Sequence, residues 1–101
     1  MIIHVTSEQQ FDDLIKGSVL IDFYADWCGP CRLLKEVLEE IDSDGSLGFD
    51  IAKVNIDDLP NIARRYSVMS IPTLLVYKDG KLVKNLLGYL PKKELLSTIK
   101  K

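Results

Sequence analysis

The sequence lacks long apolar runs, blocks of like charge and any internal repeat. Its 101 residues carry 13 lysine and arginine side chains against 15 aspartate and glutamate side chains, for a formal net charge of -2. A membrane-spanning helix needs about 20 apolar residues, and no run approaches that length. No basic cluster could displace the counterions of a nucleic acid. Neither a membrane nor a nucleic acid is therefore expected as a partner.

The first residues also lack the pattern of a secretory signal. Met1 to Glu8 hold no basic segment followed by an apolar one, so we expect the chain to work in the cytoplasm. The length and the 47% hydrophobic content suit one compact core. We therefore predict a single domain over residues 1–101, acting as a monomer.

Cysteine and histidine are scarce. Cys28 and Cys31 are the only cysteines, and His4 is the only histidine and is expected to be structural. A structural metal site needs about four ligands, so no metal is expected. A permanent disulfide is disfavoured, because closing so short a loop restrains the unfolded chain by only about 2 kcal/mol and such bonds are unusual in the cytoplasm. The C-x-x-C spacing therefore favours a redox-active pair.

Hydrophobic periodicity predicts strands that alternate with helices in an α/β fold. Residues 19–24 form a nearly continuous apolar run, typical of a central strand buried on both faces. From Cys31 onward apolar residues recur at helical spacing, so the cysteines lie where a strand turns into a helix. The remaining pattern predicts strands at 2–5, 51–56, 73–78 and 81–87, the last two joined by an Asp79-Gly80 hairpin, and helices from a Ser7/Gln10 capping box to Gly17, from Asp58 to Tyr66 and from Pro91 onward.

Four segments in this order resemble the thioredoxin family across essentially the whole chain. They are VLIDFYAD at 19–26, the WCGPC centre at 27–31, AKVNID at 52–57 and SIPTL at 70–74. The resemblance implies the thioredoxin fold, a five-stranded mixed sheet flanked by four helices. It also implies a protein-disulfide oxidoreductase without a bound cofactor, and Gly29 and Pro30 between the cysteines indicate the reducing branch of the family.

The two cysteines are expected to have different roles. Cys28 should lie at the start of the helix, where free backbone N–H groups and the helix dipole favour a thiolate, so it is the candidate nucleophile. Cys31 lies one turn further along and should be shielded by packing. It is the candidate resolving thiol, which attacks the mixed disulfide between Cys28 and a substrate.

Asp22 interrupts the apolar strand at 19–24. An unpaired carboxylate is costly there, so we expect this side chain to be buried with a raised pKa. The resemblance implies that Asp22 accepts the proton of the resolving thiol through water and that Lys53 tunes that proton. In the alternative interpretation, Asp22 meets solvent at the end of its strand and Lys53 is a solvated strand residue.

The resemblance also implies a substrate-docking surface beside the cysteines. It predicts a cis peptide bond between Ile71 and Pro72, packed against the dithiol, and pairing of the Ile71 backbone with an extended substrate segment. Trp27, Gly29, Pro30 and Pro72 would shape the site. The expected substrate contacts are Trp27, Ile71, Leu87, Gly88 and Tyr89.

The chain departs from the family pattern at a few positions. Glu36 stands where a proline commonly bends the helix, so a straighter helix is expected. Tyr24 replaces a frequent tryptophan. Met69 and Tyr89 are bulkier or more apolar than expected beside the groove. These changes concern substrate preference rather than the reaction.

The sequence thus predicts a cytoplasmic reductase of protein disulfides, active in electron transport and cell redox homeostasis. By resemblance, an NADPH-dependent flavoprotein, thioredoxin reductase, would reduce the Cys28–Cys31 disulfide again. One alternative is an oxidant or disulfide isomerase, which a redox potential would separate from a reductase. Another is a binding module that uses the fold as a scaffold in a larger assembly and keeps its partner without the cysteines.

Overall fold

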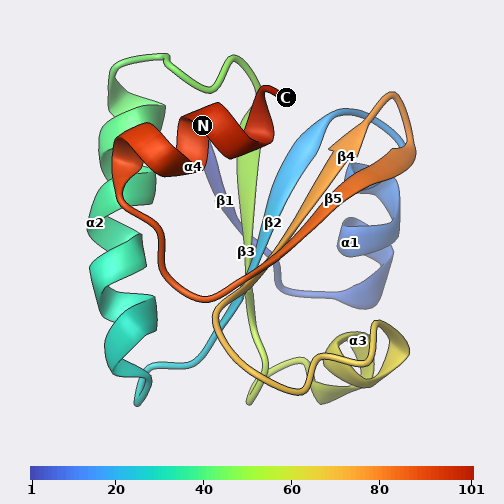
Figure 1. Ribbon diagram of the computed structural model, residues 1–101. Coiled ribbons are helices and arrows are strands. Elements are labelled where there is room, and N and C mark those ends of the chain that lie inside the picture. Colours follow the sequence, from blue (N-terminus) through green and yellow to red (C-terminus); the bar gives the residue numbers. More distant parts are fainter.

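The computed structural model describes residues Met1 to Lys101 as five strands and four helices (Figure 1). Every element predicted from the sequence is present, with ends shifted by a few residues. In chain order the elements are β1 (Ile2–His4), α1 (Glu8–Leu14), β2 (Val19–Tyr24), α2 (Gly29–Ser43), β3 (Asp50–Asn55), α3 (Pro60–Arg65), β4 (Thr73–Lys78), β5 (Lys81–Leu87) and α4 (Lys92–Ile99).

The strands form one mixed sheet in the order β1-β3-β2-β4-β5. Strands β1, β3 and β2 are parallel, whereas β4 is antiparallel to β2 and β5 is antiparallel to β4. The predicted five-stranded mixed sheet with four helices is therefore confirmed. Because β2 and β3 are parallel, the loops that follow them leave the sheet at the same edge.

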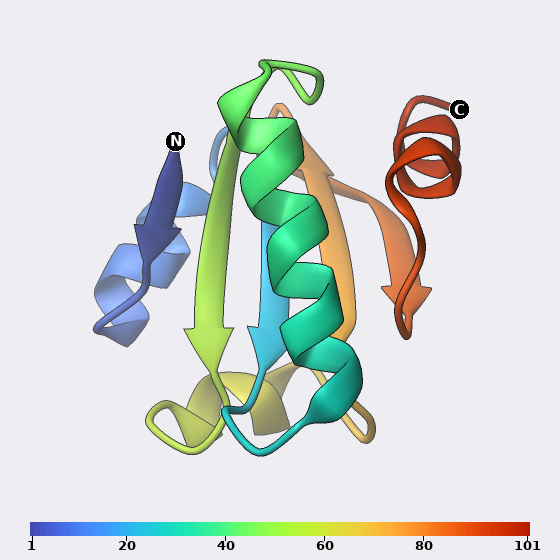
Figure 2. The ribbon, with the colours of Figure 1, turned by 90° about the vertical axis from the view of Figure 1, so that its left-hand side faces the viewer.

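Helices cover both faces of the sheet. Helices α2 and α4 lie on one face, and α1 and α3 lie on the other (Figures 1 and 2). Successive side chains of a strand point to opposite faces, so β2 contributes Leu20 to the first layer and Ile21 and Phe23 to the second. Burial on both faces explains why β2 is apolar along nearly its whole length.

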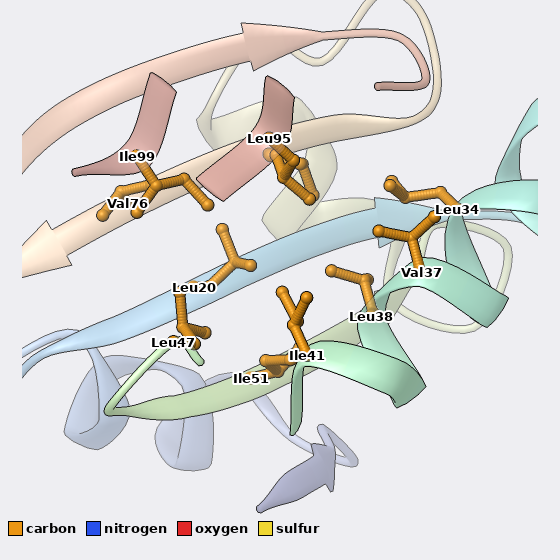
Figure 3. Close-up of a cluster of buried hydrophobic side chains, with 11 residues drawn as sticks. Leu20, Leu34, Val37, Leu38, Ile41, Leu47, Ile51, Val76, Leu95 and Ile99 are labelled. Carbon is orange, nitrogen blue, oxygen red and sulfur yellow. The ribbon is translucent and has the colours of Figure 1, made fainter. Parts of the chain in front are cut away.

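The core on the α2 side of the sheet is shown in Figure 3. Leu38 and Ile41 of α2 and Leu95 of α4 meet the sheet residues Leu20 and Ile51 there. Every member of this cluster is apolar, so none of its side chains needs a buried hydrogen-bond partner. The helical spacing of apolar residues after Cys31 therefore corresponds to the face of α2 that packs on the sheet.

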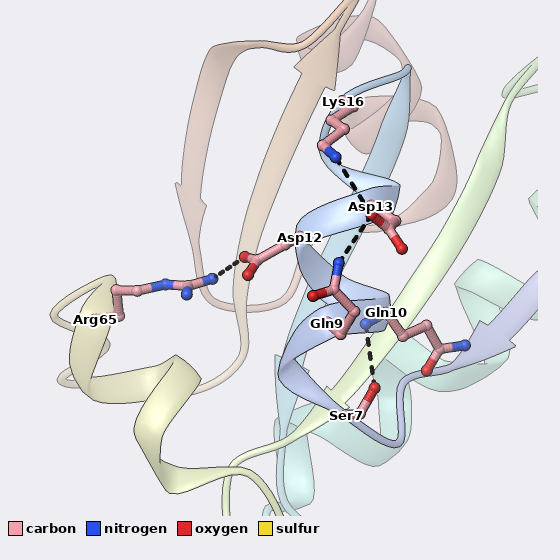
Figure 4. A network of polar contacts seen from close by, with 7 residues as sticks. All are labelled: Ser7, Gln9, Gln10, Asp12, Asp13, Lys16 and Arg65. Atoms are coloured by element: carbon pink, nitrogen blue, oxygen red, sulfur yellow. Dashed lines mark hydrogen bonds and ion pairs between the residues drawn. The ribbon is translucent and has the colours of Figure 1, made fainter.

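The start of α1 is held by its own side chains (Figure 4). The Ser7 hydroxyl accepts a hydrogen bond from the Gln10 backbone N–H at 3.1 Å, as the capping-box pattern predicted. The Gln10 side chain accepts a hydrogen bond from the N–H of Thr6 at 2.7 Å rather than from that of Ser7. On the outer face of the same helix, Asp12 forms an ion pair with Arg65 at 2.6 Å and so joins α1 to α3.

Helix α2 runs without a break through Glu36, where the family often has proline. The predicted hairpin is also present: Asp79 and Gly80 both have positive φ, of 52° and 82°. A Cβ atom at Gly80 would lie 3.1 Å from the carbonyl oxygen of Lys16, so close packing as well as φ favours glycine there. None of the four helices has the length and apolar character needed to cross a membrane.

Leu38 provides a test of the core on the α2 side of the sheet. It is fully buried, whereas Leu33 on the same helix is 57% exposed. We expect Leu38→Ala to lower the free energy of unfolding by about 2–5 kcal/mol, because it leaves a cavity. Leu33→Ala is the matched control and should change it by about 0.5 kcal/mol or less. Equal losses in denaturant titrations would contradict this packing.

Candidate active site

The two cysteines lie where the chain leaves the central strand and enters α2. Cys28 is the residue just before the helix, and its Sγ accepts a hydrogen bond from the backbone N–H of Cys31 at 3.2 Å. Pro30 lies in the first turn, where a backbone N–H is not needed. Cys28 and Cys31 form a disulfide, with their Cα atoms 5.2 Å apart. The predicted position of Cys28 at the helix start is confirmed.

The two cysteines are almost equally buried, contrary to the expectation that only Cys31 is shielded. Cys28 is 5% exposed and Cys31 is 4% exposed. They differ in their surroundings instead: Cys28 Sγ receives the N–H of Cys31 and lies 3.8 Å from the carbonyl oxygen of Ile71. A backbone N–H at the positive end of a helix stabilises negative charge on sulfur, so the environment of Cys28 favours a thiolate.

The segment around Pro72 is held against the disulfide. The Ile71–Pro72 peptide bond is cis, as the resemblance implied. Ile71 packs against the small cluster of Ala25, Cys28 and Cys31. Gly88 donates its N–H to the carbonyl oxygen of Pro72 at 2.9 Å, and its φ of 84° is one that glycine adopts readily. The structure therefore brings Ile71, Pro72 and Gly88 together with the cysteines.

Large apolar side chains are exposed among the residues predicted to contact substrate. Trp27 is 66% exposed and Leu87 is 69% exposed, while Tyr89 is exposed to a smaller extent. Gly29 has no atom within 4 Å of where a Cβ would lie, so the backbone beside Cys28 is open. Exposed apolar side chains gathered near a reactive group are typical of a protein-binding surface.

Trp27 is held by a contact that was not expected from the sequence. Its indole N–H donates to a carboxylate oxygen of Asp57 at 2.9 Å. The side chain of Asn55 accepts the backbone N–H of Asp57 at 2.9 Å and so shapes the loop after β3. The parallel pairing of β2 with β3 was the available signal, because it places the residues after both strands at one edge of the sheet.

Asp22 and Lys53 face each other across β2 and β3. Asp22 is 1% exposed, and neither of its carboxylate oxygens has a hydrogen-bond partner. Burial raises the pKa of Asp22 to about 7, and the nearby positive charge of Lys53 only partly opposes this effect. The Lys53 Nζ lies 3.9 Å from Asp22 Oδ2 and 4.4 Å from the centre of the Tyr24 ring. The predicted burial of Asp22 is confirmed, and Lys53 is buried beside it rather than solvated.

A hollow of about 210 Å³ extends from Lys53, the neighbour of Asp22, to the redox site. Cys31 and Lys53 both line it, which places the second cysteine and the partner of Asp22 on one polar space. His4, expected to be structural, is exposed and lines the same hollow, together with Tyr24, Arg32 and Lys35. Within the whole chain, no group of three or more histidine, cysteine, aspartate or glutamate side chains is placed to hold a metal ion.

Comparison with known proteins agrees with this geometry. The family model described as thioredoxin matches residues 2–101. A thioredoxin of Staphylococcus saprophyticus is 43% identical over 102 residues, which cover 100% of this chain and 98% of that protein.

Solved structures show the same fold. A mutant thioredoxin from Halobacterium salinarum has a TM-score of 0.88 and 33% identity, over 98% of this chain and 88% of that one. Thioredoxin of Malassezia sympodialis has a TM-score of 0.87 and 28% identity, over 98% of this chain and 90% of that one. With the paired cysteines at the start of α2, these matches show that the chain belongs to the thioredoxin family of protein-disulfide oxidoreductases.

Proposed function

We propose that this chain is a general reductase of protein disulfides that carries electrons from an NADPH-dependent reductase to its substrates. The observation that carries the proposal is the Cys28–Cys31 pair at the start of α2, in a chain of the thioredoxin family. Because the helix start favours a thiolate at Cys28, that residue is the proposed nucleophile.

The reaction exchanges one disulfide for another. The Cys28 thiolate attacks one sulfur of a substrate disulfide, forms a mixed disulfide and releases the first substrate thiolate. Cys31, as the resolving thiol, loses its proton and attacks Cys28 Sγ, which closes the Cys28–Cys31 disulfide and releases the second substrate thiolate. The substrate gains two electrons, and thioredoxin reductase would return two electrons to the cysteines from NADPH.

Asp22 is the proposed acceptor of the Cys31 proton. Its pKa of about 7 lets it exist in both protonation states near neutral pH, and its oxygens have no hydrogen-bond partner. The hollow lined by Cys31 and Lys53 has room for water molecules that could carry the proton from Cys31 toward Lys53, the neighbour of Asp22. Lys53 would tune the transfer, since its charge favours ionised Asp22.

Protein substrates would dock on the exposed surface around Cys28. The proposed contacts come from the segments on either side of the disulfide, and Pro72 with Gly29 and Pro30 would keep the site open. The Ile71 backbone would pair with an extended substrate segment, a mode that tolerates many sequences. The contact residues are Trp27, Ile71, Leu87, Gly88 and Tyr89.

Residues 1–101 would act as one domain and as a monomer. No bound cofactor would be needed, since the reducing equivalents are stored in the cysteines themselves. The cytoplasm is the proposed location, because a reducing compartment keeps such a pair available as a dithiol.

A redox potential tests the direction of the reaction. The reduction potential of thioredoxin is about -270 mV and that of protein disulfide isomerase is about -180 mV. We expect equilibration with a glutathione buffer to place the Cys28–Cys31 couple close to the thioredoxin value. A potential near that of the isomerase would assign the protein to oxidation or isomerisation instead.

Single serine variants test the division of labour between the cysteines. Cys31→Ser should accumulate a mixed disulfide with a disulfide-bonded test protein, because the resolving attack is lost, whereas Cys28→Ser should form none. Mass spectrometry under non-reducing conditions measures both. The reverse pattern would contradict the assignment. Retention of partners by the double variant would indicate a binding module instead.

The pH dependence of stability tests Asp22. Its folded pKa of about 7 lies above its usual value, so the folded state binds the proton more tightly than the unfolded state does. Wild-type stability should therefore fall as pH rises from about 4 to about 7 and then level off. Asp22→Asn removes this fall, which is on the order of 4 kcal/mol. Parallel pH profiles of the two proteins would show that Asp22 titrates normally.

A further inference from the structure

The largest of three surface hollows lies beside the redox site, and Leu87 is the only one of its lining residues with a role in the mechanism above. Its volume is about 420 Å³. One wall is the segment 66–70, which follows α3, and the other is formed by Thr73, Asn85 and Leu87 at neighbouring ends of β4 and β5.

Both walls continue directly into the docking surface. Ser70 precedes Ile71, whose carbonyl oxygen lies 3.8 Å from Cys28 Sγ. Leu87 pairs with Thr73 and precedes Gly88, which is hydrogen-bonded to Pro72. A substrate segment that pairs with the Ile71 backbone and continues alongside Ser70 would therefore reach this hollow.

The wall formed by residues 66–70 is held in place by hydrogen bonds. Ser67 has a φ of 53°, an uncommon conformation for a residue other than glycine, and its N–H donates to the carbonyl of Arg64. The Val68 N–H donates to the carbonyl of Ala63 at 3.0 Å. The Thr73 hydroxyl donates to the carbonyl of Ser70 at 2.6 Å. These contacts indicate that the hollow exists before a ligand arrives.

The chemistry of the lining is uncharged. Charged residues make up 28% of the chain, yet none of the eight lining residues is charged. Met69 is 93% exposed and Leu87 69% exposed, so each wall presents a large apolar side chain to solvent. A thioether adapts to different apolar partners. A charged side chain entering here would lose water and find no opposite charge in the lining.

We propose that this hollow is a specificity subsite that takes an uncharged, preferably apolar, side chain of a protein substrate, two or three residues from the reacting cysteine. An extended chain advances about 3.3 Å per residue, so residues 69–71 span about 7 Å and run beside two or three residues of an extended substrate. The subsite rests on the proposed function, because its occupant is the substrate whose disulfide Cys28 attacks.

Disulfide-linked peptides test the subsite. Each peptide carries Leu, Glu or Lys at one varied position. That position lies two or three residues from the disulfide-bonded cysteine, either before it or after it. We expect the reduced protein to react with the best-placed Leu peptide about fivefold faster than with its Glu and Lys counterparts. Equal rates for all peptides would overturn the subsite alone. Failure to reduce any peptide or protein disulfide would overturn the proposed function and the subsite with it.

Charge substitutions at Asn85 give a second measurement. Asn85 is an exposed strand residue in the wall of the hollow. Asn85→Asp should raise the rate ratio of Lys to Glu peptides about fivefold, and Asn85→Lys should lower it similarly. Lys81→Gln is the control: it lies at the other end of β5, changes the net charge as Asn85→Asp does, and should leave the ratio unchanged.

Thermal unfolding should show that all three variants remain folded. If Asn85→Asp and Lys81→Gln changed the rate ratio of Lys to Glu peptides equally, the net charge of the protein would explain the effect. That result would overturn the subsite. Analytical ultracentrifugation at the assay concentration tests whether a second copy of the chain occupies the hollow. A dimer that Asn85→Lys dissociates would show that a second copy fills the hollow, and would also overturn the proposal.

Discussion

Strand β2 must be apolar on both faces and must also end beside the reactive cysteines. It is covered by α2 and α4 on one side and by α1 and α3 on the other. Burial of β2 holds it within the sheet. The short segment after its carboxyl end places Cys28 at the start of α2. The redox site therefore has a rigid support, although the cysteines belong to a turn. This rigidity favours disulfide exchange, because Cys28 must reach a sulfur of the substrate and Cys31 must then reach Cys28.

The same strand contains Asp22, a buried carboxyl group that lowers the stability of the fold when it is ionised. Asp22 has no hydrogen-bond partner, and the Lys53 ammonium lies 3.9 Å away, beyond a hydrogen-bonding distance. Stability alone would favour an apolar residue at this position, since a buried carboxylate is costly. The raised pKa is the property that such burial produces, and it suits proton exchange near neutral pH. Local instability and proposed function therefore have one physical origin.

The surroundings of the disulfide differ sharply in charge. The hollow lined by Cys31 and Lys53 also has Arg32 and Lys35 in its lining, so charged side chains surround it. The hollow beside Met69 has no charged lining residue. Each is lined by side chains from separate segments of the chain, so neither can be recognised from one stretch of sequence.

The sequence by itself determined the elements and the chemistry. Apolar periodicity located the strands and helices, Asp79-Gly80 located the hairpin, and the C-x-x-C spacing at a strand-to-helix junction identified the redox pair. These are local signals, carried by neighbouring residues. Tertiary structure alone decided the nearly equal burial of the cysteines, the Trp27–Asp57 hydrogen bond and the uncharged hollow. Each of those depends on how distant segments pack, because burial and contact are properties of the assembled sheet and its helices rather than of any single segment.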